Sequence, residues 1–81
     1  MISGAQIRAA RGLLNWSGET LANTVGVTRQ TIQRLERHDG LPPSRSQTLD
    51  DIQHAFEAAG VEFIGSPDDA PGVRLVRRIK D

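Results

Sequence analysis

The chain has 81 residues, ten basic and ten acidic side chains, a formal net charge of zero and no cysteine. This length predicts one small domain near the lower limit for a self-sufficient core, so dimerisation would be a natural source of extra stability. The lack of cysteine excludes disulfides and thiolate metal sites. With no signal-peptide pattern and no apolar run near the roughly 20 residues that span a bilayer, a cytoplasmic protein without membrane contact is expected.

The charges are unevenly distributed along the chain. Residues 1–47 carry six arginines against three acidic groups (net +3), whereas residues 48–81 carry four basic against seven acidic groups (net −3). The first segment is therefore the better candidate for a surface that faces phosphates.

The first predicted helix begins at Ser3. Ser3 and Gln6 have the spacing of a capping box, in which each residue bonds the backbone N–H of the other. Trp16 follows the helix as a large apolar anchor, while Arg8 and Arg37 are expected to be flanking charges with no fixed role. An apolar stripe recurs at helical spacing: Ile7, Ala10 and Leu14.

Residues 17–36 predict two short helices joined by a tight turn at Gly26, the layout of a helix-turn-helix. Gly26 can adopt a positive φ without a Cβ penalty, and Thr28 offers a hydroxyl that caps the second helix, expected over residues 28–37. Ile32 and Leu35 are expected to face the core. The outward positions are rich in side chains that can bond base edges in the major groove: Thr28, Arg29, Gln30, Gln33 and Arg34.

The rest of the chain predicts a loop, a fourth helix and a hairpin. Paired prolines exclude helix from 41–47. Thr48 and Asp51 have the spacing of a second capping box, so the fourth helix is expected to begin there and to stop at Gly60. Strands at residues 61–64 and 73–77 are predicted around a turn-rich loop at residues 65–72. The buried stripe of the fourth helix is expected to be Leu49, Ile52, Ala55, Phe56 and Ala59.

These features resemble the bacterial Xre-like helix-turn-helix regulators, which are related to phage repressors and Cro proteins. The resemblance implies a mainly α fold: a four-helix repressor-like domain over residues 1–60, followed by a two-stranded β-hairpin tail over residues 61–81 of the same domain. Phage repressors usually continue with a fifth helix; the tail is instead similar to that of a subset of short bacterial regulators. The residues that carry the resemblance are Ile7, Arg11, Trp16, Ser17, Glu19, Leu21, Ala22, Gly26, Val27, Thr28, Thr31, Ile32, Glu36, Pro43, Thr48, Leu49 and Ile52.

The resemblance also implies roles for individual residues. Arg11 and Glu36 are expected to bridge the first helix to the end of the third as a structural pair. At Gly18 the family often has a glutamine that holds a phosphate, so either that contact is missing here or backbone N–H groups replace it. Base contacts are expected from Arg29, Gln30 and Arg34, and backbone or secondary DNA contacts from Ser17, Thr28, Thr31, Gln33 and Arg45. The competing interpretation is that these are ordinary solvated positions on an exposed surface.

The expected function is sequence-specific transcriptional regulation, by repression or by repression with activation, through a palindromic site on double-stranded DNA. The expected oligomer is a homodimer, because an isolated hairpin is marginal in water and its open edges could pair with a second copy. Basic residues at 77, 78 and 80 could instead blunt that edge or contact phosphate. The hairpin residues expected at the dimer interface are Val61, Phe63, Ile64, Val73, Leu75 and Val76.

The alternative function is that of a protein-interaction module, such as an antitoxin or anti-activator. Gly18 and the zero net charge favour this alternative. Neither an enzyme nor a metal site is expected, because His38, His54 and the paired aspartates lack the partners that such sites need. No cofactor and no small-molecule ligand is expected.

Overall fold

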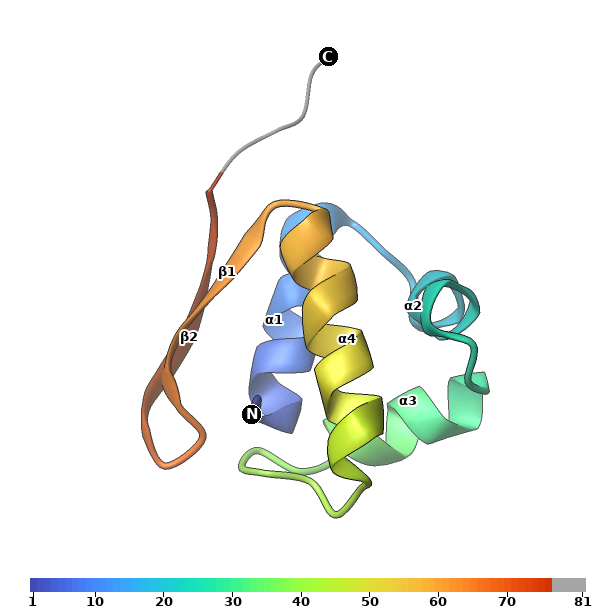
Figure 1. The fold of residues 1–81 in the computed structure, drawn as a ribbon, viewed down its shortest axis with the longest axis horizontal. Helices are drawn as coiled ribbons and strands as arrows, with labels where there is room; N and C mark the ends of the chain where they lie inside the picture. Colours follow the sequence, from blue (N-terminus) through green and yellow to red (C-terminus); the bar gives the residue numbers. More distant parts are fainter. Residues whose placement is uncertain (77–81) are drawn as a thin grey trace.

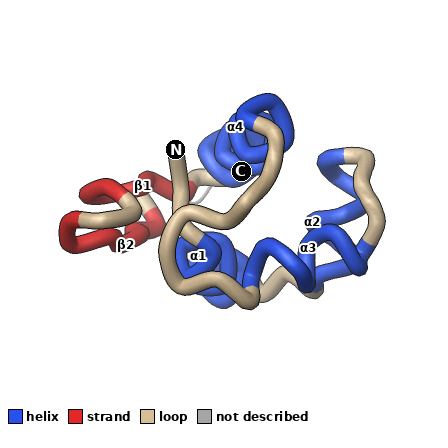
Figure 2. Tube along the Cα trace, turned by 90° about the horizontal axis from the view of Figure 1, so that it is seen from below, coloured by secondary structure: helices blue, strands red, loops and turns tan. Residues whose placement is uncertain are grey.

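The computed structural model describes residues 1–76, and Figure 1 shows helices followed by a hairpin. The hairpin lies on one side of α1 and α4, and α2 and α3 lie on the other (Figures 1 and 2). This order confirms the predicted mainly α fold with a hairpin tail. The elements are α1 (Gly4–Leu14), α2 (Gly18–Val25), α3 (Arg29–Glu36), α4 (Ser46–Ala58), β1 (Val61–Ser66) and β2 (Asp69–Leu75).

The starts of α1 and α3 follow from local hydrogen bonds that the sequence predicts. Ser3 Oγ accepts from the Gln6 amide at 3.0 Å and the Ser3 amide donates to Gln6 Oε1 at 2.9 Å, which completes the capping box. Thr28 Oγ1 accepts from the Thr31 amide at 3.1 Å. Gly26 ends α2 with a φ of 89°, so the turn before α3 uses a backbone conformation that glycine adopts without strain.

The predicted start of α4 is wrong. The helix begins at Ser46, with Arg45 in the N-cap position and no side-chain cap, so Thr48 already lies in its first turn. Helical hydrogen bonding resumes soon after the last proline of the loop, with the Leu49 amide donating to the Arg45 carbonyl at 3.2 Å. Because no proline follows in the helix, backbone hydrogen bonding can begin the helix before the predicted cap at Thr48.

The predicted loop at residues 65–72 is also too long. The strands continue to the pair Ser66 and Asp69, because a register shift between Ile64 and Ser66 absorbs Gly65, whose φ is 73°. Pro71 lies inside β2, where an outward-facing position needs no N–H. The strand ends at Leu75, so the prediction that it includes Val76 is wrong; residue 77 of the predicted strand lies outside the described residues, as do the basic residues at 78 and 80.

The core joins all four helices to the start of the hairpin. Phe56 lies at its centre, with ring centroids 5.6 Å from Trp16 and 6.0 Å from Phe63. Two members of the expected α4 stripe, Ala55 and Ala59, are only partly buried. Within the described part of the chain, no helix is long and apolar enough to span a membrane. The buried apolar residues are Ile2, Ile7, Ala10, Leu21, Ala22, Ile32, Leu35, Leu49, Ile52, Phe56 and Val61.

Candidate nucleic-acid interface

Burial of two side chains fixes which face of α3 is turned outward. Ile32 is 1 % exposed and Leu35 is fully buried, so the opposite face of this helix is left in solvent. Thr31 is half-buried between the two faces. The residues on the solvent face are those that the helical spacing places there: Thr28, Arg29, Gln30, Gln33 and Arg34.

The arginines on and beside this face form no ion pair in the described structure, whereas the others do. Arg8, Arg11 and Arg74 each pair with a carboxylate. Because the remaining guanidinium groups have no carboxylate partner among the described residues, they are available to an anionic partner. The unpaired arginines are Arg29 and Arg34 on α3, Arg37 at its end and Arg45 before α4.

Arg34 makes one weak contact: its Nη1 lies 3.4 Å from the Pro43 carbonyl oxygen. At this length the bond is near the limit of what counts as hydrogen bonding. The guanidinium is therefore available to an incoming acceptor.

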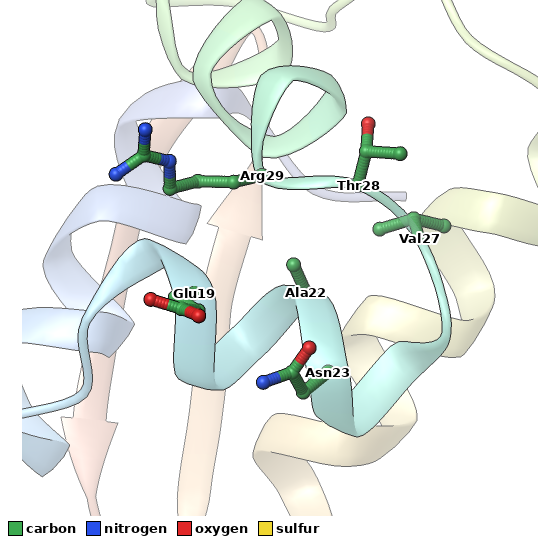
Figure 3. A pocket seen from close by; sticks show the side chains of 6 residues that line it. All are labelled: Glu19, Ala22, Asn23, Val27, Thr28 and Arg29. Carbon is green, nitrogen blue, oxygen red and sulfur yellow. The ribbon is translucent and has the colours of Figure 1, made fainter.

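A groove of about 410 Å³ runs between α2 and α3 beside this face. Figure 3 shows the Glu19 and Arg29 side chains extending toward the same side of it, one from each helix. The groove therefore presents a carboxylate beside a guanidinium at the edge of the α3 face. Its remaining lining comes from Ala22, Asn23, Val27 and Thr28.

The start of α2 lies close to the start of α3. Ser17 Oγ accepts from the Thr20 amide at 3.0 Å and so caps α2. A Cβ built on Gly18 would lie 3.9 Å from Arg29 Cγ and 4.0 Å from Ile32 Cγ2, which are ordinary packing distances. This position therefore accepts a Cβ, and packing around it does not require a glycine.

Arg11 and Glu36 join α1 to the last residue of α3. Arg11 Nε and Nη2 donate to the two carboxylate oxygens of Glu36 at 2.7 and 2.8 Å, and Arg11 Nη1 donates to the Trp16 carbonyl at 3.0 Å. The pair is largely shielded from solvent, since the side chains are 25 % and 11 % exposed. The hydrogen bond with Glu36, together with its charge, raises the pKa of Arg11 although burial opposes this.

Arg8 makes contacts that the sequence did not predict. Its Nη2 donates to Asp39 Oδ1 at 2.7 Å, and its Nη1 donates to the carbonyl oxygen of Glu36. The prediction that Arg8 has no fixed role is therefore wrong. Its partners lie 28 and 31 residues away, so no local pattern could have identified them. Two arginines of α1 thus hold the C-terminal end of α3.

The hairpin residues expected at a dimer interface have unequal exposure. The Val61 side chain is 2 % exposed, so it is not available to a second copy. Phe63, Val73 and Leu75 are partly buried against the same core. The two that leave large apolar surface in solvent are Ile64 and Val76, at 42 % and 58 % exposure.

The exposed face of α3 lies within a segment that matches a known protein family. Residues 7–45 match the profile of a family described as helix-turn-helix. The matched segment begins in α1 and contains α2, α3 and the loop that follows, so it includes every arginine of the unpaired group. No curated protein shows significant similarity to the chain.

Proposed function

We propose that this chain, whose residues 7–45 form a helix-turn-helix domain of the Xre-like family, is a transcriptional regulator that binds a palindromic operator as a homodimer. The family is one of DNA-binding domains, so a general role in DNA binding follows from the match. Repression, alone or combined with activation, is the regulatory mode that we propose. The observation that carries this proposal is the exposed face of α3, on which the arginines are free of ion pairs.

In the proposed complex, α3 lies in the major groove. Arg29, Gln30 and Arg34 contact base edges, since arginine bonds guanine and glutamine bonds adenine in pairs of hydrogen bonds. Thr28 Oγ1 accepts the Thr31 amide at 3.1 Å and lies 2.9 Å from Thr31 Oγ1. Either hydroxyl of this pair can donate to the other, which leaves the second O–H group as a donor for a phosphate. Further contacts outside the base-reading set are proposed for Ser17, Thr31, Gln33 and Arg45.

Because the chain carries no net charge, a dimer would supply DNA affinity that charge alone does not. With a net charge of zero, the chain has no overall attraction to DNA, so it should bind non-specific DNA weakly. Two copies that engage two half-sites at once gain affinity without a larger charge on either copy. The half-sites would lie about one helical turn apart, roughly 34–36 Å between centres.

We propose that the dimer forms along an edge of the hairpin. The Val76 amide donates to the Gly60 carbonyl at 2.8 Å, so alternation along an antiparallel ladder directs the backbone groups of Val61 and Phe63 out of β1. Such open edges pair readily with a second strand. On β2 the corresponding row is interrupted, because Pro71 has no N–H. The edge of β1 is therefore the better candidate, with its backbone rather than the Val61 side chain at the interface.

The test is selection of sites from random DNA, followed by fluorescence-anisotropy titration over a range of salt concentrations. The expected result is a palindrome whose affinity falls with salt, by a log–log slope of about −0.9 for each phosphate neutralised. If a folded protein enriches no sequence, the proposal fails. The protein-interaction alternative, an antitoxin or anti-activator that uses the same scaffold, would then be favoured.

A further inference from the structure

Gln6 joins α1 to both strands of the hairpin. Its side chain is buried, at 2 % exposure. Nε2 donates to the carbonyl oxygens of Ile64 at 3.1 Å and Gly72 at 2.9 Å, while Oε1 accepts from the Ser3 amide at 2.9 Å. Both amide hydrogens and the amide oxygen are therefore engaged, and one side chain connects the capping box of α1 to a tail more than fifty residues away.

This contact lies where the apolar packing of the hairpin ends. Ile64 and Gly72 are partners across the two strands. On the α4 side of this pair, Val61 and Phe63 pack into the core. On the turn side, none of the strand residues at 65, 66 and 69–71 is buried. Gln6 thus holds the hairpin at the last point before it projects into solvent.

The same turn of α1 abuts the C-terminal end of α3. The Gly4 amide donates to the Gly40 carbonyl at 3.0 Å. A Cβ on Gly4 would come closer than 3.0 Å to the carbonyl oxygens of Leu35 and His38, so the backbones are in direct contact. In Figure 1 the N-terminal turn of α1 lies beside both the hairpin and the loop that follows α3. One helical turn therefore separates the hairpin from the helix proposed to read DNA.

We infer that Gln6 is a positioning residue, which fixes the angle between the hairpin and α3 and thereby the half-site spacing that the dimer accepts. This inference rests on the proposed function, since spacing has a meaning only for a dimer joined through the hairpin. One added base pair turns a half-site by about 35° and moves it by about 3.4 Å. A dimer with a fixed hairpin rejects that change, whereas a dimer with a loosened hairpin accommodates it.

The experiment compares two variants of the full-length chain. Gln6→Met keeps the length of the side chain and removes the donors to Ile64 and Gly72. Ser3→Ala is the matched control: it removes the other half of the capping box and leaves the bonds to the hairpin in place. Both variants lose a buried hydrogen bond at the start of α1, so both are expected to lose some stability. Affinity is measured for operators in which identical half-sites are separated by spacers of different lengths.

The wild type and Ser3→Ala should prefer the same spacer, by about tenfold over spacers one base pair longer or shorter, comparable to a single mismatched base pair. Gln6→Met should bind all three within about threefold, which reflects the loss of that preference. An unchanged profile for Gln6→Met overturns the inference, and so does an equal flattening in Ser3→Ala, because stability alone would then explain the effect. If the wild type itself shows no spacing preference, the two-half-site function fails before the variants are compared.

A measurement on the wild type keeps the inference testable if Gln6→Met does not fold. Native-state hydrogen exchange reports the free energy of each local opening. If Gln6 holds the hairpin, the backbone amides of Ile64 and Gly72 should open together with the Gln6 amide, as one unit. Opening of the hairpin amides at a lower free energy than the first turn of α1 would show that the hairpin moves independently, and the inference would be wrong.

Discussion

At the scale of single residues, the exposed side chains of α3 should contribute more to recognition than to stability. Arg34→Ala removes a guanidinium whose only intramolecular bond in the described structure is a long one to Pro43. The fold should be retained, while discrimination against wrong bases should fall by about 1–3 kcal/mol. Titration of the cognate site and of single-base variants measures this. Arg37→Ala is the control with the same loss of charge, since Arg37 is exposed, forms no ion pair in the described structure and is not among the proposed base-contacting residues. Equal base discrimination by the Arg34 variant and the wild type would exclude a base contact.

Arg11, in contrast to Arg34, should contribute to folding stability rather than to DNA recognition. Arg11→Met leaves the Glu36 carboxylate, 11 % exposed, without its partner, which we expect to cost about 2–3 kcal/mol in unfolding free energy, below the range for a fully buried pair. The double variant Arg11→Met with Glu36→Leu should recover most of this, because no unpaired charge remains. Denaturant unfolding tests both. A double variant as unstable as the single one would mean that packing, rather than the unpaired charge, dominates.

The pH dependence of this pair follows from the raised pKa of Arg11. A cationic group whose pKa is raised by folding stabilises the native state fully below its unfolded pKa. That contribution disappears only as pH rises through the folded pKa. Since arginine titrates far above neutrality, the Arg11 contribution should be constant through the neutral range and decline only in strong alkali.

At the scale of the elements, two glycines of α1 offer a matched comparison. Gly4→Ala places a methyl group against the carbonyl oxygens of Leu35 and His38, so α1 must move away from α3, which should cost about 1–3 kcal/mol. Gly12→Ala meets no atom within 4 Å and should stabilise the same helix by about 0.5–1 kcal/mol. Chemical unfolding distinguishes them. Two variants that change stability in the same direction would contradict direct contact between α1 and the end of α3.

The start of α2 provides a second prediction for an element. Gly18→Gln introduces the side chain that the resemblance implies for this position, where a Cβ meets only ordinary packing distances. If the glycine has removed a phosphate contact, DNA affinity should rise about tenfold, since a hydrogen bond to a charged group is worth about 1.5 kcal/mol. Gly18→Ala controls for the gain in helix propensity, about 1 kcal/mol. An affinity gain common to both variants would assign the effect to helix stability.

Sequence patterns predicted the elements whose signals are local. Ser3 with Gln6, Thr28 and Gly26 each act within a few residues, and each helix end that they predict is confirmed. The same reasoning failed at Thr48, because a capping pattern states only what a side chain could do there. After the prolines of the loop, backbone hydrogen bonding begins the helix at Ser46, before the predicted cap at Thr48.

Contacts between distant elements could not be predicted from the sequence. Arg8 bonds to the end of α3 and Gln6 bonds to the hairpin across 28 to 66 residues. The pattern around Arg8 indicates no partner, and the capping box predicted for Gln6 accounts for its bonds with Ser3 but not for those with the hairpin. The Arg11–Glu36 bridge was expected through family resemblance alone. For the interface, the helical period gave the outward face of α3, but which arginines remain unpaired depends on where the carboxylates of other elements lie.

At the scale of the whole molecule, the proposed dimer makes a prediction about the hairpin. Pairing of two β1 edges would bring both copies of residue 64 onto one face of a continuous sheet, near the seam. Ile64→Lys should therefore place like charges close together and weaken dimerisation by about tenfold or more. Because Ile64 is 42 % exposed in the single chain, the fold should tolerate the change.

Sedimentation equilibrium over a range of protein concentrations measures the dimer dissociation constant directly. Leu41→Lys is the matched control, since Leu41 is 49 % exposed on the loop before α4, and it should leave this constant unchanged. In the Ile64 variant, weaker dimerisation should also reduce affinity for the palindrome while affinity for a single half-site is kept, because α3 is untouched. If the Ile64 variant dimerises as tightly as the wild type, the hairpin edge is not the interface. The open surface of α4 would then be the next candidate to mutate.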